Sequence, residues 1–541
     1  MKHLRKTEFI LITVLLVVYW GIFTYLNLFC FQQHVDSDIA AESLLAREIW
    51  NQKTLTPDNW AGSTERYVFG MPAIAAPFYG ISGSMSLATG IACVILGIFF
   101  CVSLFCFFKW IGLRTETTVL AMLMLAALPM NGLENENQIV PFFALLFYVF
   151  ADWYVLFFAL AIFSFWFYRF LKEKTVYKKA DFKLLLPAFV LFVSATILSA
   201  GGMHTVQIAI FPLFLYELIS LLIETDYFRK KIPFARLIPG FYVLSQMGAF
   251  FISTLHHGQV DYVTYMNSNT EVVSRIFHML PELVLKNFGY EGIVKVGSLQ
   301  SLLQFMIIAF LILVGMALVS IYGKKTDKTD PGETKTDSLP SRAKDTLGYF
   351  ICMFSVSAVL MILASVGVLH YYLFAVWFVA VLAVCIFFQY LQDEKKFFSD
   401  IILCMVLLFS VLNLNVTYGK AIKCEDNLKE YVEVTESLKQ NGIEYGYAEF
   451  WDANRLTLVC DGDLTFGCSY YMGDLGMYWW LTNTDWYPPT LPTDMKTAYV
   501  IRRGKEDEFL AQFENPSCME SVFNNDGFTV YISDTNYVTR P

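Results

Sequence analysis

Long charge-free apolar runs recur along this chain of 541 residues as far as about position 419, and they constrain its fold more than any other feature. A run of about 20 apolar residues crosses the hydrocarbon core of a bilayer as a helix. The composition agrees, because 56% of the residues are hydrophobic and only 16% are charged. We therefore predict a mainly α-helical, polytopic membrane protein with eleven spans, at 9–31, 84–108, 117–133, 150–171, 184–200, 205–223, 237–255, 302–322, 347–367, 371–391 and 399–419.

The distribution of Lys and Arg predicts the orientation of these spans. Basic residues gather in every second connection, at 2–6, 109–114, 169–183, 229–236, 324–344 and 395–396. Basic segments stay in the cytoplasm, so we place the N-terminus inside and the C-terminus outside. The predicted membrane domain, 1–419, then has outer loops at 32–83 and 256–301 and a polar cytoplasmic linker at 323–346.

Residues 420–541 have the composition of a soluble domain. A helical pattern covers 425–440, and strand-like runs follow at IEYGYAEFW, NRLTLVC, DLTFGCSYY, TAYVIRR and GFTVYIS. We predict a small extracytoplasmic α/β domain, called the tail below. The net charge of −9 argues against a nucleic-acid partner. Four cysteines permit one or two disulfides of open connectivity: Cys424, Cys460, Cys468 and Cys518.

The first outer loop, 32–83, carries amphipathic helical patterning in the segment DIAAESLLAREIW. Aromatic side chains suited to the lipid headgroup zone follow it, namely Trp60, Tyr67, Phe78 and Tyr79. We therefore expect surface helices that lie along the outer membrane boundary.

Two acidic pairs stand at the outer ends of predicted spans. Asp36 and Asp38 lie in the segment VDSDIAAE, and Glu134 and Glu136 lie in ENEN of the next outer loop. Such carboxylates serve as a general base, as metal ligands, or as the solvated start of a loop, where Asp also caps helices. Two pairs at the mouth of one helical bundle can converge on one divalent cation or one proton.

This layout resembles the C superfamily of glycosyltransferases, called GT-C, and its bacterial branch related to protein mannosyltransferases and glycosyltransferase family 39. The features that carry the resemblance are the early span ending in VDSDIAAE, the long first outer loop, the motif ENEN, the many further spans and a tail with YGYAEFWDANRLT. The resemblance implies an integral membrane enzyme that uses a polyprenyl-phosphate-linked sugar. It also implies that Asp36 or Asp38 is the catalytic base and that Glu134 or Glu136 helps to bind the acceptor or a metal. Asp38 and Glu136 would be ligands of that divalent cation, Mg²⁺ or Mn²⁺.

The chain departs from this family pattern at two places. Family 39 enzymes have Asp-Glu at the first motif, whereas this chain has Asp-Ser-Asp, so the identity of the base stays open. Where several relatives carry an Arg-Tyr pair that contacts the donor phosphate, this chain has HYYLF, with His370 in place of Arg. The candidate phosphate contacts are Arg66, His256, His257 and His370, with Arg47 and His204 as further ones.

We interpret the chain as a membrane glycosyltransferase that moves a sugar from a polyprenyl phosphate to an extracytoplasmic glycan, lipid or polymer. Aromatic side chains of the tail are candidates for stacking on sugar rings, namely Trp451, Trp479, Trp480, Trp486 and Tyr487. A transporter or lipid flippase is the alternative. That class predicts internal repeats and ionisable groups near the middle of the membrane, which the sequence does not display clearly.

Overall fold

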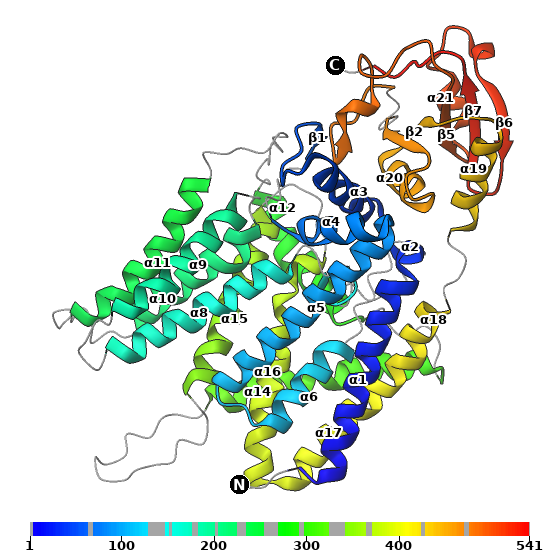
Figure 1. Ribbon diagram of the computed structural model, residues 1–541. Helices are drawn as coiled ribbons and strands as arrows, with labels where there is room; N and C mark the ends of the chain where they lie inside the picture. Colours follow the sequence, from blue (N-terminus) through cyan, green and yellow to red (C-terminus); the bar gives the residue numbers. More distant parts are fainter. Residues whose placement is uncertain are drawn as a thin grey trace, which may run out of the picture. The chain divides into compact units, whose positions relative to one another are not determined.

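The structure is a computed structural model, shown in Figure 1. It describes residues 4–62, 69–127, 146–150, 154–175, 182–200, 204–223, 234–253, 269–290, 297–323, 341–363, 370–423, 428–469 and 475–539. Internal contacts divide the chain into two compact units. The helical unit comprises Met1–Thr24, Leu96–Leu255 and Val263–Ile422, and the mixed unit comprises Tyr25–Ile95, His256–Tyr262 and Lys423–Pro541.

The helical unit is built from long apolar helices. Its longer elements are α1 (Lys6–Phe29), α5 (Met85–Trp110), α6 (Thr115–Ala127), α8 (Val155–Thr175), α9 (Leu185–Ser199), η2 with α10 (Val206–Ile210 and Phe211–Ile223), α11 (Phe234–Ser253), α14 (Leu299–Tyr322), α15 (Ser341–Leu363), α16 (Ala375–Glu394) and α17 (Lys396–Asn413). Its shorter elements are η1 (Phe182–Leu184), α12 (Asn269–Ser274), η4 (Arg275–Met279), α13 (Leu280–Asn287), η5 (His370–Leu373), η6 (Leu414–Tyr418) and α18 (Gly419–Ile422).

Seven helices among the described residues are long and apolar enough to cross a membrane. They are α1, α5, α8, α14, α15, α16 and α17 with η6, and four shorter apolar helices accompany them: α6, α9, η2 with α10, and α11. Each of the eleven predicted spans coincides with one of these helices. The prediction of a mainly helical, multi-pass membrane protein is therefore confirmed.

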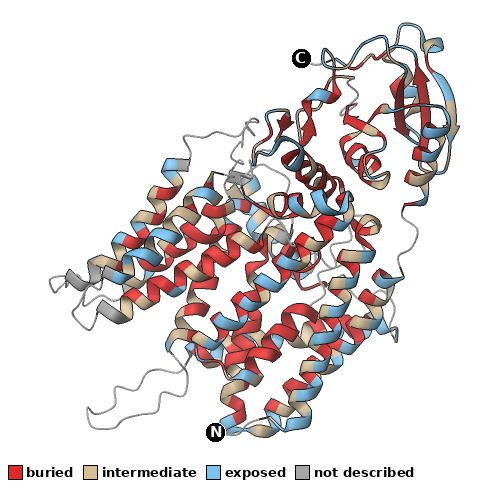
Figure 2. Cartoon of the chain, viewed as in Figure 1, coloured by how far each residue is buried: buried red, intermediate tan, exposed pale blue. Residues whose placement is uncertain are grey.

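Helix α16 is the central element of the helical unit. It packs against α6, α14, α15 and α17, and nearly its whole length is buried (Figure 2). Aromatic rings fill much of this interior, and the stacked rings of Phe158 and Phe378 lie 4.1 Å apart. Each such pair contributes about 0.5–1.5 kcal/mol beyond its buried area.

The mixed unit joins the first outer loop to the tail. The loop contributes the outer ends of α1 and α5 together with α2 (Phe31–His34), α3 (Ser37–Gln52), β1 (Trp60–Ala61) and α4 (Met71–Ser82). The tail contributes α19 (Lys429–Gln440), β2 (Tyr445–Ala448), α20 (Phe450–Val459), β3 (Thr465–Cys468), β4 (Thr482–Asn483), η8 (Thr484–Trp486), β5 (Thr497–Arg502), α21 (Glu506–Leu510), η9 (Pro516–Cys518), β6 (Glu520–Asn524) and β7 (Phe528–Ser533).

The tail contains a five-stranded sheet of order β3-β2-β5-β7-β6. Strand β2 runs parallel to β3 and β5, whereas β7 runs antiparallel to β5 and β6. The strand prediction for NRLTLVC is wrong, because all of these residues but the last belong to α20. The reason is topological: β2 and β3 are parallel neighbours, and a parallel pair needs a crossover, usually a helix. The other four predicted strand runs and the predicted helix near 425–440 are found.

Strand β1 of the loop pairs antiparallel with β4 of the tail, with Trp60 opposite Asn483 and Ala61 opposite Thr482. Trp60 is therefore buried in this pairing, and its prediction as a headgroup-zone residue is wrong. The side chain of Gln32 donates to the Leu458 carbonyl at 3.2 Å, which ties the end of α2 to α20. In the structure, the first outer loop and the tail thus belong to one compact unit, whereas the domain boundary predicted at residue 420 assigns them to different domains.

Three of the four tail cysteines lie in the described residues. Cys460, Cys468 and Cys518 are free thiols, and Cys424 lies outside the described residues. The core of the tail therefore rests on apolar burial and hydrogen bonds, such as the one from the Tyr447 hydroxyl to the Trp486 carbonyl at 2.8 Å.

Candidate functional site

The acidic segment VDSDIAAE forms the start of α3, the amphipathic helix that the sequence predicts. Asp36 is the residue before the first turn, in extended conformation, and its Oδ1 accepts a hydrogen bond from the Ile39 N–H at 2.9 Å. The backbone carbonyl of Asp36 also accepts from the Ala40 N–H at 3.0 Å. Asp36 thus performs the capping role for which Asp is well suited, while Asp38 lies in the first helical turn.

Asp38 presents a carboxylate to which no group among the described residues donates a hydrogen bond. Its side chain is partly exposed, but the surrounding protein restricts its hydration. This desolvation and, to a smaller extent, the neighbouring charge of Asp36 together raise the pKa of Asp38 to about 8. Desolvation also raises the pKa of Asp36, whereas its cap hydrogen bond and the charge of Arg455 lower it.

The tail holds the residue between the two acids. Ser37 is buried, and its hydroxyl donates to the Phe450 carbonyl at the start of α20. The side-chain amide of Asn454, one turn further along α20, donates to the Ser37 hydroxyl at 3.3 Å. It also lies 3.4 Å from the Leu481 carbonyl, just before β4. The segment that carries both carboxylates is therefore fixed by contacts with α20.

A chain of polar contacts leads from the tail sheet towards Asp36. Arg502 of β5 donates two hydrogen bonds to Asp452, at 2.7 and 2.8 Å, and the Tyr431 hydroxyl donates to Asp452 at 2.7 Å. Arg455 in turn donates to the Tyr431 hydroxyl at 3.0 Å and lies over its ring. Both of these contacts join Arg455 to Tyr431, and the positive charge of Arg455 lowers the pKa of the Asp36 carboxyl.

Most of the other predicted site residues lie outside the described residues. Glu134, Glu136, Arg66, His256 and His257 belong to this group. His370 begins η5, but its side chain is not among those that the structure describes. Their roles stay predictions.

The predicted metal set of Asp38 and Glu136 cannot be assembled from the described residues, since Glu136 is not one of them. Within the described ranges, no group of three or more His, Cys, Asp or Glu side chains is placed to hold a metal ion. Asp36 and Asp38 supply two carboxylates only. A divalent cation at this site stays a prediction.

Two further candidates for phosphate contacts are described, and both are engaged with neighbours. The His204 ring lies 3.3 Å from the Tyr154 hydroxyl and stacks on Phe157. Arg47 of α3 contacts Glu48 at 3.3 Å and lies over the ring of Trp486.

The structure separates the aromatic candidates of the tail by exposure. Trp486 is only 7% exposed and Tyr487 is fully buried, so both belong to the core of the mixed unit. Trp451 is 51% exposed at the first turn of α20. It packs edge-on against Phe450, whose carbonyl binds Ser37. Trp451 is therefore an exposed aromatic next to the acidic segment.

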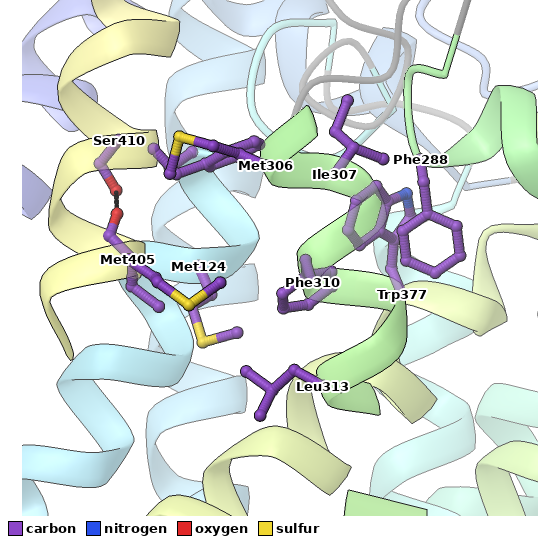
Figure 3. A pocket seen from close by; sticks show the side chains of 12 residues that line it. Met124, Phe288, Met306, Ile307, Phe310, Leu313, Trp377, Met405 and Ser410 are labelled. Carbon is purple, nitrogen blue, oxygen red and sulfur yellow. Dashed lines mark hydrogen bonds between the residues drawn. The ribbon is translucent and has the colours of Figure 1, made fainter. Parts of the chain in front are cut away.

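The helical unit contains an apolar groove between α14, α16 and α17. Its narrow part, with a free volume of about 30 Å³, is lined by Phe288, Phe310, Trp377 and other side chains shown in Figure 3. A second, wider apolar pocket of about 430 Å³ shares the lining residues Leu313 and Met405 with the narrow one and is also lined by Lys395; the two neighbouring pockets together are called the apolar groove below. The two parts follow α14 from Met306 to Met316, which is about 15 Å of helix. The lining is almost wholly apolar, as a hydrocarbon chain requires.

Sequence reasoning did not identify Asn454 and Arg455 as parts of the site. Both lie in the tail segment YGYAEFWDANRLT that supports the family resemblance, so the signal was present in the sequence. Their proximity to Asp36 depends on packing across more than 400 residues of chain, which no local pattern encodes.

No family model matches the chain, and no curated protein matches it. The chain is similar to the crystal structure of ArnT from Cupriavidus metallidurans bound to undecaprenyl phosphate, with a TM-score of 0.46 and 13% identity over 96% of this chain and 97% of that chain. It is also similar to the apo-state structure of ArnT from the same organism, with a TM-score of 0.45 and 11% identity over 97% of each chain.

Proposed function

We propose that this protein is a membrane glycosyltransferase that transfers a sugar from a polyprenyl-phosphate donor to an extracytoplasmic acceptor, with Asp38 as the general base. The observation that carries the proposal is the Asp38 carboxylate. It has a raised pKa and no hydrogen-bond donor among the described residues, and it lies on a helix start fixed by Asp36 and by the tail. A general base works best when its pKa lies near the operating pH.

In the proposed reaction, an acceptor hydroxyl attacks the anomeric carbon of the donor sugar. The bond between that carbon and the phosphate oxygen breaks as the new glycosidic bond forms, and the configuration inverts. Asp38 takes the proton of the hydroxyl, and polyprenyl phosphate leaves with the bonding electron pair. Asp36 acts by fixing the helix start, because its Oδ1 is already occupied by the Ile39 N–H.

The direct test uses purified, full-length protein in liposomes with radiolabelled sugar on polyprenyl phosphate. Because the acceptor class is open, the assay offers glycan, glycolipid and polymer acceptors from a bacterial envelope in parallel. We expect label to appear in one acceptor fraction together with an equal amount of polyprenyl phosphate. Transport of intact donor across the liposome membrane without glycosyl transfer would instead favour a flippase.

The apolar groove supports the donor class, because a prenyl tail needs a hydrocarbon-lined path within the bilayer. Ala309 of α14 lines the wider part of this groove. We expect Ala309→Trp to fill it and to raise the Michaelis constant for a long-chain donor by about tenfold, equivalent to about 1.4 kcal/mol. The Michaelis constant for a donor with a short prenyl chain should stay at the wild-type value.

The matched control for this variant is Val319→Trp on the same helix, since Val319 is 72% exposed and lies outside the groove lining. Equal effects of the two variants on the long-chain donor would contradict a role of the groove in donor binding.

Trp451 is the candidate contact for a sugar unit of the acceptor. An exposed indole ring can stack on a sugar ring, which favours a glycan acceptor. The Trp451 side chain contributes little to the core because it is half-exposed. We expect Trp451→Ala to raise the Michaelis constant for the acceptor by about fivefold to tenfold, or about 1–1.5 kcal/mol. Donor binding should not change, and Trp451→Phe should recover most of the loss.

The charge distribution supports an extracytoplasmic tail. In a variant with Cys518→Ser, Glu514→Cys places an exposed thiol on the tail, and Glu394→Cys places one at the end of α16. We expect a membrane-impermeant maleimide to label Glu514→Cys in intact cells and Glu394→Cys only after lysis. The reverse pattern would overturn the orientation and, with it, an extracytoplasmic acceptor.

A further inference from the structure

Asn454 of the tail contacts Ser37, the residue between the two acids, through its side-chain amide. Asn454 is completely buried in α20, and a buried amide costs free energy unless its hydrogen bonds are made. Its Nδ2 lies 3.3 Å from the Ser37 hydroxyl, 3.5 Å from the Ser37 carbonyl and 3.4 Å from the Leu481 carbonyl. The Asn454 amide therefore donates its hydrogen bonds to Ser37 of the acidic segment and to Leu481, the residue before β4.

These contacts form an ordered chain. The Asn454 amide donates to the Ser37 hydroxyl, and that hydroxyl donates to the Phe450 carbonyl. Since Phe450 and Asn454 are one turn apart, both ends of the chain belong to α20. Ser37 is thus held by hydrogen bonds to a single helix of the tail. Because Asp36 and Asp38 are its neighbours in the chain, these hydrogen bonds also restrict their positions.

We propose that Asn454 is a positioning residue of the acidic site, which places Asp38 through Ser37, so that the tail is a working part of the site. The inference rests on the proposed function. Catalytic groups need placement within a fraction of an ångström, and an error of about 1 Å can lower the rate by about 10²-fold. The buried contacts of Asn454 supply this restraint to a carboxylate that accepts no hydrogen bond from the part of the chain that the structure describes.

The test compares Asn454→Ala with Thr457→Val in the full-length, reconstituted protein. Thr457 is an equally buried polar residue one turn further along α20, but its hydroxyl binds the Ala453 carbonyl and the Phe466 N–H, within the tail. We expect Asn454→Ala to lower kcat by about 10²-fold with little change in the Michaelis constant for the donor. Thr457→Val should lower the melting temperature similarly but leave kcat near the wild-type value.

Amide hydrogen exchange of the same proteins gives a readout that does not need activity. Asn454→Ala should speed exchange in residues 37–45 of α3 while the β5 and β7 amides keep their protection. Thr457→Val should speed exchange around α20 and β3 and leave α3 unchanged. If Asn454→Ala misfolds, Ser37→Ala removes the same hydroxyl from the loop side and should give the same two effects.

Unchanged exchange in α3 overturns the positioning role, whatever the activity. Faster exchange in α3 with a wild-type kcat shows that the contact orders the helix without serving the reaction, which also overturns the proposal. If the wild-type protein transfers no sugar from any polyprenyl-phosphate donor, the proposed function fails. The exchange data then still decide whether Asn454 positions the acidic segment.

Discussion

Asp38→Asn is expected to lower turnover by about 10²–10⁴-fold, because an amide cannot accept the acceptor proton. Asp36→Asn should be much milder, since Asn caps a helix nearly as well as Asp and the Ile39 N–H keeps its acceptor. The measurement is the rate of sugar transfer from polyprenyl phosphate by reconstituted protein. Wild-type turnover in Asp38→Asn would remove the main support for this base.

The pH dependence distinguishes loss of the base from loss of the fold. Because the pKa of Asp38 is raised to about 8, kcat/KM of the wild type should rise with pH through that value. Between the ordinary pKa of 3.8 and about 8, the folded protein binds a proton at Asp38 that the unfolded chain has released. The fold therefore loses stability as pH rises through this window. Asp38→Asn should consequently melt no lower than the wild type at pH 8.5.

Arg502→Met is expected to lower the free energy of unfolding of the tail by about 3 kcal/mol. The variant leaves Asp452, with a side chain only 2% exposed, without its cationic partner. An uncompensated carboxylate in that position is strongly unfavourable. The measurement is urea-dependent proteolysis of the tail in the full-length protein in detergent.

Two further variants serve as controls for Arg502→Met. Adding Asp452→Asn to Arg502→Met should recover part of the loss, because a neutral amide tolerates burial better than a charge. Lys439→Met removes an exposed ion pair with Asp463, 2.7 Å in length, and should cost about 1 kcal/mol or less. Equal losses for Arg502→Met and Lys439→Met would contradict a structural role for the pair of Arg502 with the buried Asp452 carboxylate.

The membrane architecture could be predicted from sequence because its signal is local. A span needs about 20 consecutive apolar residues, and each such run coincides with a helix in the structure. The segment NRLTLVC shows where local patterns fail. Its apolar residues suit a short strand, but the parallel pairing of β2 with β3 requires a crossover there, and α20 supplies it.

The candidate site was only partly accessible to the same reasoning. Asp36 and Asp38 were found because two carboxylates follow directly after an apolar run. Asn454 and Arg455 were missed because their roles arise from contacts between the loop and the tail. Trp486 and Tyr487 were candidates for sugar contacts until burial placed them in the core, since an aromatic residue has the same sequence signature in either role.

The pairing of β1 with β4 also sets an order of events during synthesis. The Asn59 carbonyl accepts a hydrogen bond from the Thr484 N–H, so two segments 425 residues apart must meet. At a synthesis rate of about 5–20 residues per second, the loop waits for about 20–80 seconds before the tail exists. Until then α3 has neither Asn454 nor Phe450 to hold Ser37. An unfinished chain thus carries the two acids without the restraint that the proposed reaction needs, so activity should begin only once the tail has been made and has folded.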